Sequence, residues 1–219
     1  MITEPEIPFA RVAMFVRQHT HDVRNGLNSL DLEASLLREL VTDDEGRETV
    51  ERVHKQLREM AEGMRSLASH FQEPKPSASP ISARDLFLIW REQGASLPQL
   101  PEVEWVDELS DEMVNVDVEM MAVAFRELLA NTAHFSRGGK ATASARRDGT
   151  GVVFELREPK PEPPNTARWG EIFSTTRRGG YGLGLWSARR IIEANGAVFM
   201  QRSAPDGSGL VSHITLPIF

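Results

Sequence analysis

The chain has 219 residues, a mass of 24.5 kDa, a formal net charge of -7 and no cysteine. This length suits two small domains with separate hydrophobic cores, and the lack of cysteine excludes disulfides and thiolate metal sites. Because Lys and Arg are scattered among acidic residues, no basic face is expected for binding a nucleic acid backbone.

Two runs of apolar side chains at helical spacing open the chain, at residues 12–41 and 50–71. Steps of three, four and seven are typical of a helix with an apolar seam. Residues 42–46, Thr-Asp-Asp-Glu-Gly, supply a turn and a helix cap between the runs. The seam positions are Val12, Val16, His19, Val23, Gly26, Leu30, Leu37 and Val41, followed by Val50, Val53, Leu57, Met60, Met64, Leu67 and Phe71.

The pattern predicts a helical hairpin over residues 1–73. Burying each large seam side chain contributes about 1.5 to 3 kcal/mol, but one pair of helices cannot enclose both apolar stripes. We therefore expect a homodimer in which two hairpins form a four-helix bundle. No apolar run reaches the roughly 18 to 20 residues that cross a bilayer, and no signal peptide pattern is present, so we expect a cytoplasmic protein without a membrane partner.

Residues 74–80, Pro-Lys-Pro-Ser-Ala-Ser-Pro, predict a linker, and residues 81–219 predict a second domain. Two tight turns, Arg-Asp-Gly-Thr and Pro-Asp-Gly-Ser, join pairs of strand-like segments. These segments alternate with helical ones, which predicts an α/β sandwich. Helices are expected at 82–94, 118–135 and 183–195, the last ended by Gly196, and strands at 103–106, 140–147, 152–156, 197–202 and 210–216.

The segment His-Asp-Val-Arg-Asn-Gly-Leu, residues 21–27, carries the first candidate chemical group. At about 100° per residue, His21 lies about 200° around the helix from His19, so we expect His19 to face inward and His21 to face solvent. Asp22 can accept a proton from one ring nitrogen and make the other more nucleophilic. Asn25, one turn along, can orient a water for hydrolysis.

Phe15, followed by His21-Asp-x-Arg-Asn-x-Leu on the first helix of a hairpin, resembles the dimerisation and phosphotransfer segment of two-component histidine kinases. The resemblance implies that His21 carries a phosphoryl group and exchanges it with the receiver domain of a response regulator. Asp22 and Asn25 would then be its catalytic partners. Because this motif starts near the beginning of the chain, we expect a separate sensor protein to supply the signal.

Residues 125–134, Phe-Arg-Glu-Leu-Leu-Ala-Asn-Thr-Ala-His, are similar to the asparagine box of the ATP-binding domain shared by histidine kinases, gyrase-type ATPases and Hsp90-type chaperones, the GHKL or Bergerat fold. In that family the residue matching Asn131 holds the Mg²⁺ ion that bridges the triphosphate. Glu127 lies one turn earlier on the same face, and His134 stands where the family has a basic residue near the phosphates. The resemblance implies ATP and magnesium as cofactors.

Residues 179–185, Gly-Gly-Tyr-Gly-Leu-Gly-Leu, resemble the second glycine box of the same family. Glycines allow a backbone to approach phosphates closely, and the start of the following helix favours anions. The resemblance therefore assigns Gly180, Gly182 and Gly184 to the phosphate side of a nucleotide site.

The first glycine box is replaced by prolines. The family has Asp-x-Gly-x-Gly, whose aspartate accepts from the adenine amino group, whereas residues 157–164 read Arg-Glu-Pro-Lys-Pro-Glu-Pro-Pro. Glu158 stands in the place of the aspartate, after a strand that we expect to end near Leu156. We expect the longer side chain and the rigid prolines to misplace the carboxylate. Loss of one charge-assisted hydrogen bond costs about 1.5 to 3 kcal/mol, one to two decades of affinity, which argues against ATP binding.

The histidine segment and the second glycine box match the family, whereas the first glycine box does not. Three functions are compatible with this combination. The first is a phosphorelay protein in which His21 exchanges a phosphoryl group with receiver aspartates and the altered ATP domain serves as a docking platform, as in dimeric histidine phosphotransferases built on a kinase-like scaffold. The second is an active, soluble ATP-dependent histidine kinase. The third is a scaffold or anti-sigma-like regulator in which neither site performs chemistry.

Overall fold

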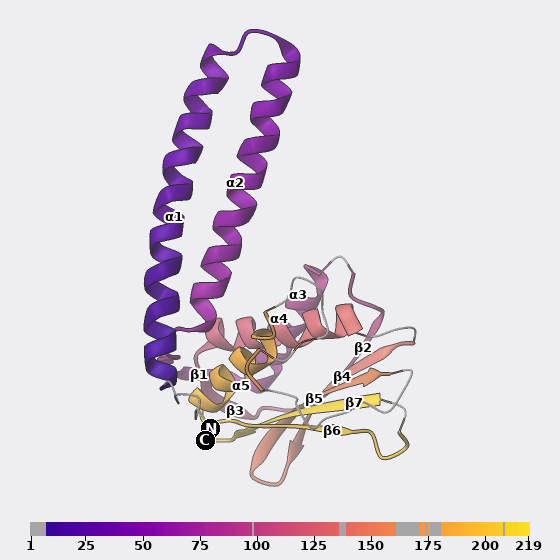
Figure 1. The fold of residues 1–219 in the computed structure, drawn as a ribbon. Coiled ribbons are helices and arrows are strands. Elements are labelled where there is room, and N and C mark those ends of the chain that lie inside the picture. The colour runs from indigo at the N-terminus through magenta and orange to yellow at the C-terminus, as the bar shows by residue number, and fades with distance from the viewer. Residues whose placement is uncertain are drawn as a thin grey trace, which may run out of the picture. The chain divides into compact units, whose positions relative to one another are not determined.

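A computed structural model of the chain describes residues 8–97, 99–135, 139–160, 171–173, 175, 181–207 and 209–219. The chain divides into two compact units, Met1–Glu73 and Pro74–Phe219, and each is considered by itself (Figure 1). Within the described residues, every helix is too short or too polar to span a lipid bilayer.

The first unit is a helical hairpin of α1 (Phe9–Leu40) and α2 (Asp44–His70), as the apolar spacing predicts. Asp43 caps α2, because its carboxylate accepts a hydrogen bond from the Gly46 amide at 2.7 Å. At the other end of the hairpin the rings of Phe9 and Phe71 stack with their centroids 6.0 Å apart. Both ends of the helix pair are therefore fixed by local contacts.

The contact between α1 and α2 uses mostly small side chains. Buried residues recur on α1 at every seventh position, as Ala13, Thr20, Leu27 and Ala34. On α2 the buried His54 places Nδ1 2.8 Å from a carboxylate oxygen of Asp31, while its Nε2 has no hydrogen-bond partner. This buried polar pair joins the two helices, and an exposed ion pair between Arg38 and Glu51 at 3.3 Å joins them as well.

Only part of the predicted seam lies in this interface. His19, Leu30 and Leu37 are exposed on α1, and Val53 and Met60 are exposed on α2. The expectation that His19 faces inward is wrong for the single hairpin, and its ring instead stacks on Phe15 at 5.8 Å. The reason is that α1 presents its small residues to α2, which leaves a second, bulkier apolar stripe uncovered.

We expect His54→Ala to lower the free energy of unfolding by about 1 to 3 kcal/mol, because it removes a buried hydrogen bond and leaves Asp31 without its partner. Urea denaturation of the full chain, followed by helical circular dichroism, measures this change. Lys55→Ala is the matched control, since Lys55 is exposed and makes only a 4.0 Å ion pair with Glu59. Equal free energies of unfolding for the two variants would show that the His54–Asp31 pair does not stabilise the hairpin.

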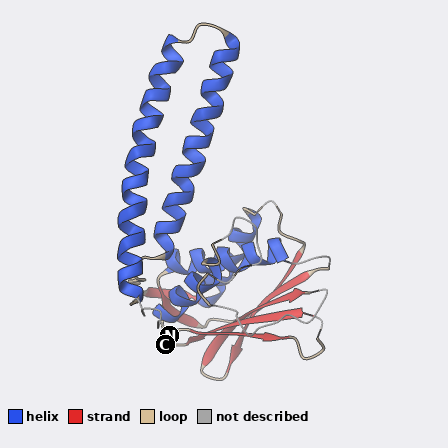
Figure 2. Cartoon of the chain, in the orientation of Figure 1, coloured by secondary structure: helices blue, strands red, loops and turns tan. Residues whose placement is uncertain are grey.

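The second unit is the predicted α/β sandwich. Its five-stranded sheet has the order β2-β4-β5-β7-β6, in which only β2 and β4 are parallel. Three helices cover one face of this sheet (Figures 1 and 2). The elements are α3 (Ala83–Ala95), β2 (Val103–Glu108), α4 (Val118–Phe135), β4 (Ala141–Asp148), β5 (Gly151–Pro159), α5 (Gly184–Ala194), β6 (Val198–Ser203) and β7 (Gly209–Pro217).

Two short strands were not predicted. β1 (Ser79–Ser82) pairs antiparallel with β3 (Met113–Val116), so the last residues of the predicted linker 74–80 belong to a small second sheet. Neither strand is longer than four residues, too short for a clear alternation of polar and apolar side chains.

Aromatic side chains form the centre of the core between helices and sheet. Trp90 of α3 stacks on Phe125 of α4 with centroids 4.9 Å apart, and both approach Phe154 of β5. All three are fully buried. This packing fixes α4, the helix that carries the asparagine motif, against the middle strand of the sheet.

Candidate functional site

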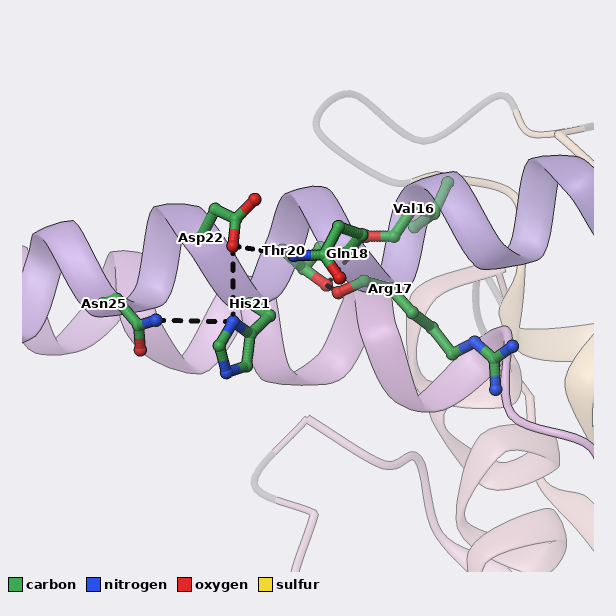
Figure 3. A network of polar contacts seen from close by, with 7 residues as sticks. All are labelled: Val16, Arg17, Gln18, Thr20, His21, Asp22 and Asn25. Carbon is green, nitrogen blue, oxygen red and sulfur yellow. Dashed lines mark hydrogen bonds and ion pairs between the residues drawn. The ribbon is translucent and has the colours of Figure 1, made fainter.

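His21 lies in the N-terminal half of α1, with 55% of its side chain exposed. Its Nδ1 is 3.3 Å from Oδ1 of Asp22 and 3.3 Å from Nδ2 of Asn25, as Figure 3 shows. In the described part of the chain, no polar group contacts its Nε2. The structure therefore brings the three predicted residues together on one nitrogen and leaves the other ring nitrogen open.

The two contacts at Nδ1 of His21 exclude one another. Asp22 can only accept a hydrogen bond, which requires a proton on Nδ1, whereas the Asn25 amide can donate only to a bare Nδ1. In the tautomer that Asp22 selects, the lone pair lies on Nε2. An exposed, unprotonated Nε2 backed by a carboxylate is a nucleophile.

Gln18 sets the charge and orientation of Asp22. Its amide donates to Oδ1 of Asp22 at 2.9 Å, and this bond, followed by the contact with His21, holds the pKa of Asp22 below its usual value. The carboxylate is thus ionised wherever an imidazole is neutral. The sequence analysis did not identify Gln18, although its place four residues before Asp22 puts both on one helix face.

The second group of predicted residues surrounds α4. Glu127 and Asn131 are half-buried on this helix, and His134 is exposed one turn further on. Gly184, the first residue of α5, lies against the Glu127 carboxylate so closely that any β-carbon there would overlap it. The start of α5 therefore faces a carboxylate of the chain itself, at the helix end that favours negative charge.

The other glycines of the second glycine box are only partly described. Gly182 has a φ of 66°, a left-handed conformation that favours glycine. Gly180 lies outside the described residues. The path of the backbone just before α5 thus depends on glycine, as the motif predicts for at least one position.

The prolines do not end the strand before Glu158. β5 continues past Leu156 to Pro159, which pairs with Gly209 at the end of the ladder. A proline is tolerated at a strand end because its missing amide interrupts no further pairing. Glu158 therefore remains in the strand with 3% of its side chain exposed, and the strand extends three residues beyond its predicted end near Leu156.

Lys160 forms an ion pair with the carboxylate of Glu158. Its Nζ lies 2.8 Å from Oε2, with only 11% of the lysine side chain exposed, and 5.9 Å above the ring of Phe135. Thr132 of α4 also interacts with this carboxylate. Burial raises the pKa of Glu158, and the neighbouring lysine opposes that rise. Lys160 was not among the predicted residues, although alternate positions of an extended segment share a face.

These residues do not fit an adenine nucleotide as they stand. The carboxylate that the resemblance assigns to the adenine amino group already binds the Lys160 ammonium group. Across the residues that the structure describes, no three His, Asp or Glu side chains gather as a metal site, and Asn131 stays a predicted magnesium ligand. ATP binding at this site would first require Lys160 to leave Glu158.

The chain has the fold of a histidine kinase core, in which a helical hairpin precedes an ATPase-type α/β domain. No protein-family model matches the chain. It is 27% identical over 226 residues to the alginate biosynthesis sensor protein KinB of Pseudomonas aeruginosa, an alignment that covers 96% of this chain and 38% of KinB. The chain thus spans well under half of this relative.

Solved structures show the same fold. The crystal structure of full-length ShkA in complex with AMPPNP has a TM-score of 0.75 and 20% identity, and covers 94% of this chain and 46% of ShkA. The Acinetobacter baumannii histidine kinase AdeS has a TM-score of 0.55 and 15% identity, over 92% of this chain and 96% of AdeS. The mycobacterial sensor histidine kinase MprB matches 64% of this chain and 97% of its own, with a TM-score of 0.54 and 20% identity. These likenesses confirm the predicted fold, a helical hairpin followed by an α/β domain as in solved histidine kinases.

We expect Glu158→Gln to change how stability depends on pH. Because the pKa of Glu158 is raised in the folded state, the native chain binds more protons than the unfolded chain above the ordinary value of 4.5. The stability that Glu158 contributes is complete below that pH and is lost as pH rises through the folded pKa.

Glutamine stays neutral throughout, so the variant should gain stability relative to wild type as pH rises from about 4.5 toward neutrality. Urea unfolding at several pH values measures the difference in free energy of unfolding between the two proteins. A difference in free energy of unfolding that stays constant over this pH range would contradict a raised pKa of Glu158 in the folded state.

Proposed function

We propose that this protein is a histidine phosphotransferase of a two-component system. Nε2 of His21 takes a phosphoryl group from the aspartate of a response-regulator receiver domain and returns it to such an aspartate. The observation that carries the proposal is the exposed ring of His21, whose Nδ1 contacts the ionised Asp22 and whose Nε2 is open to solvent. Exchange with a response regulator would take place in the cytoplasm.

The proposed transfer is a displacement at phosphorus. The lone pair of His21 Nε2 attacks the phosphorus of the receiver's acyl phosphate, the N–P bond forms, and the P–O bond to the receiver aspartate breaks. That aspartate leaves as a carboxylate with the bonding electrons. The proton on Nδ1 stays in the hydrogen bond to Asp22, whose negative charge stabilises the positive ring. A role for Asn25 in orienting water remains a prediction.

Homodimerisation belongs to the proposal because the hairpin leaves large apolar side chains uncovered. Exposed apolar groups at helical spacing favour a second copy of the same hairpin as their cover. The exposed apolar side chains include Phe15, Leu30, Leu37, Leu40, Val53 and Met60.

The ATPase-type unit would then act as a platform for the receiver rather than as a nucleotide site. Support comes from the Glu158–Lys160 pair, which uses the carboxylate expected to bind adenine, and from the prolines that replace the first glycine box. The core of this unit is filled by its own aromatic and aliphatic side chains, Trp90, Phe125 and Phe154 among them, so its packing does not require a nucleotide.

An active histidine kinase is the second candidate, and one observation favours it. The structure of ShkA, which is similar over nearly the whole chain, was determined in complex with AMPPNP. Besides this observation, the sequence resemblance of Asn131, Glu127 and Gly184 to the phosphate side of the family's site supports this candidate. A scaffold that performs no chemistry is the third candidate, and it would leave His21 unlabelled by every phosphoryl donor.

Transfer from phosphorylated receivers tests the first candidate. Receiver domains labelled with ³²P by acetyl phosphate should label wild type and His19→Ala equally and should not label His21→Ala. Asp22→Ala should slow labelling by at least about tenfold, because it removes the group that favours a bare Nε2. Equal labelling of wild type and His21→Ala would exclude the proposed acceptor.

Incubation with magnesium and γ-labelled ATP separates the first two candidates. We expect no label on His21 and no nucleotide binding in the micromolar range, because Lys160 must first be displaced. Labelling of His21 that disappears in Asn131→Ala would instead identify an active kinase.

A further inference from the structure

A cleft of about 170 Å³ lies between α1 and α2 beside His21. All the residues around it belong to the hairpin, and Thr20 and Met64 are among them. Three arginines line it with His21, namely Arg17 and Arg24 of α1 and Arg65 of α2. The cleft therefore combines the reactive imidazole with guanidinium groups from both helices.

Among the residues that the structure describes, the three arginines have no acidic partner. Arg38, Arg84 and other arginines of the chain pair with carboxylates, whereas among the described residues no carboxylate oxygen lies within 4.0 Å of the cleft arginines. No acidic residue lines the cleft. The carboxylate of Asp22 is held outside it by Gln18 and by Nδ1 of His21.

Positive charges gathered in one cleft repel each other unless an anion lies between them. These arginines are grouped without a carboxylate from the described residues, although the chain as a whole is acidic, with a net charge of -7. Guanidinium groups bind phosphoryl oxygens through paired, charge-assisted hydrogen bonds. Arg17 and Arg24 flank His21 by about one helical turn on either side, and Arg65 faces it from the other helix. In Figure 3 the Arg17 side chain runs along α1, away from the ring, so Arg24 and Arg65 are the principal candidates.

We propose that this arginine cleft binds the phosphoryl group after its transfer to Nε2 of His21. The inference rests on the proposed function, because it assigns the residues that stabilise the phosphorylated form. The guanidinium groups offset the negative charge that the phosphoryl group brings, and they shift the exchange equilibrium toward phosphohistidine. They do not attack or leave, so they are binding residues for the transferred group.

Phosphoramidate, a small donor that phosphorylates histidine without a receiver, tests this site in the full chain. ³¹P NMR would follow the amount of phosphohistidine at His21 and its decay once the donor is removed. We expect Arg65→Ala, and more strongly Arg24→Ala/Arg65→Ala, to reduce the amount or shorten the lifetime by about tenfold. Arg65→Lys should restore part of the effect, since it keeps the charge but not the paired geometry.

Arg58→Ala is the matched control, because Arg58 is an exposed arginine two turns earlier on α2 and does not line the cleft. Arg65 is exposed as well and Arg24 is half-buried, and circular dichroism of each variant verifies that the hairpin still forms. Phosphohistidine that is equally abundant and long-lived in wild type, Arg65→Ala and the double variant would overturn the inference. Absence of phosphohistidine at His21 in wild type would also overturn it.

Failure of the arginine site can be distinguished from failure of the proposed phosphotransferase function. Labelling by phosphoramidate that depends on Arg65, without exchange with any receiver, would retain the phosphoryl site and reject the phosphotransferase. Exchange with a receiver that is unchanged in Arg65→Ala would retain the phosphotransferase and reject the arginine site.

Discussion

Two side chains compete for Nδ1 of His21, and the outcome decides whether this residue can carry a phosphoryl group. Asp22 stabilises the ring with a proton on Nδ1, whereas Asn25 stabilises the opposite tautomer. Gln18 orients the Asp22 carboxylate through a hydrogen bond and lowers its pKa, so it supports the tautomer with a bare Nε2. Because α1 contacts α2 through Thr20 and other small residues, the adjacent His21 stays open to solvent.

The second unit has the α/β fold of solved histidine kinase structures, with prolines where a glycine box was expected. Replacement of glycines by prolines does not break β5, because Pro159 lies at the end of the ladder. Glu158 would be costly to bury alone, and Lys160 supplies both the opposite charge and the hydrogen bond that burial requires. This ion pair accounts for a buried glutamate at the position where the sequence resemblance places the adenine contact.

The sequence predicted the elements with strong periodicity and missed contacts that depend on tertiary packing. Long apolar repeats located α1, α2 and α4, and Gly196 ended α5 with a φ of 76°. The spacing of His21, Asp22 and Asn25 along one helix was sufficient to predict that they meet. Both stripes of α1 are apolar, however, so periodicity could not decide which one faces α2. The Asp31–His54 and Glu158–Lys160 pairs depend on the exact packing of neighbouring elements, which no local pattern specifies.

The tautomer of His21 tests the account most directly. Long-range ¹H–¹⁵N correlation NMR of the ¹⁵N-labelled chain, at a pH where the ring is neutral, reports which nitrogen carries the proton. We predict a protonated Nδ1 and a bare Nε2 in wild type, with a shift toward the other tautomer in Asp22→Ala. A wild-type ring protonated at Nε2 would contradict the account, because the exposed nitrogen would then have no lone pair for phosphorus.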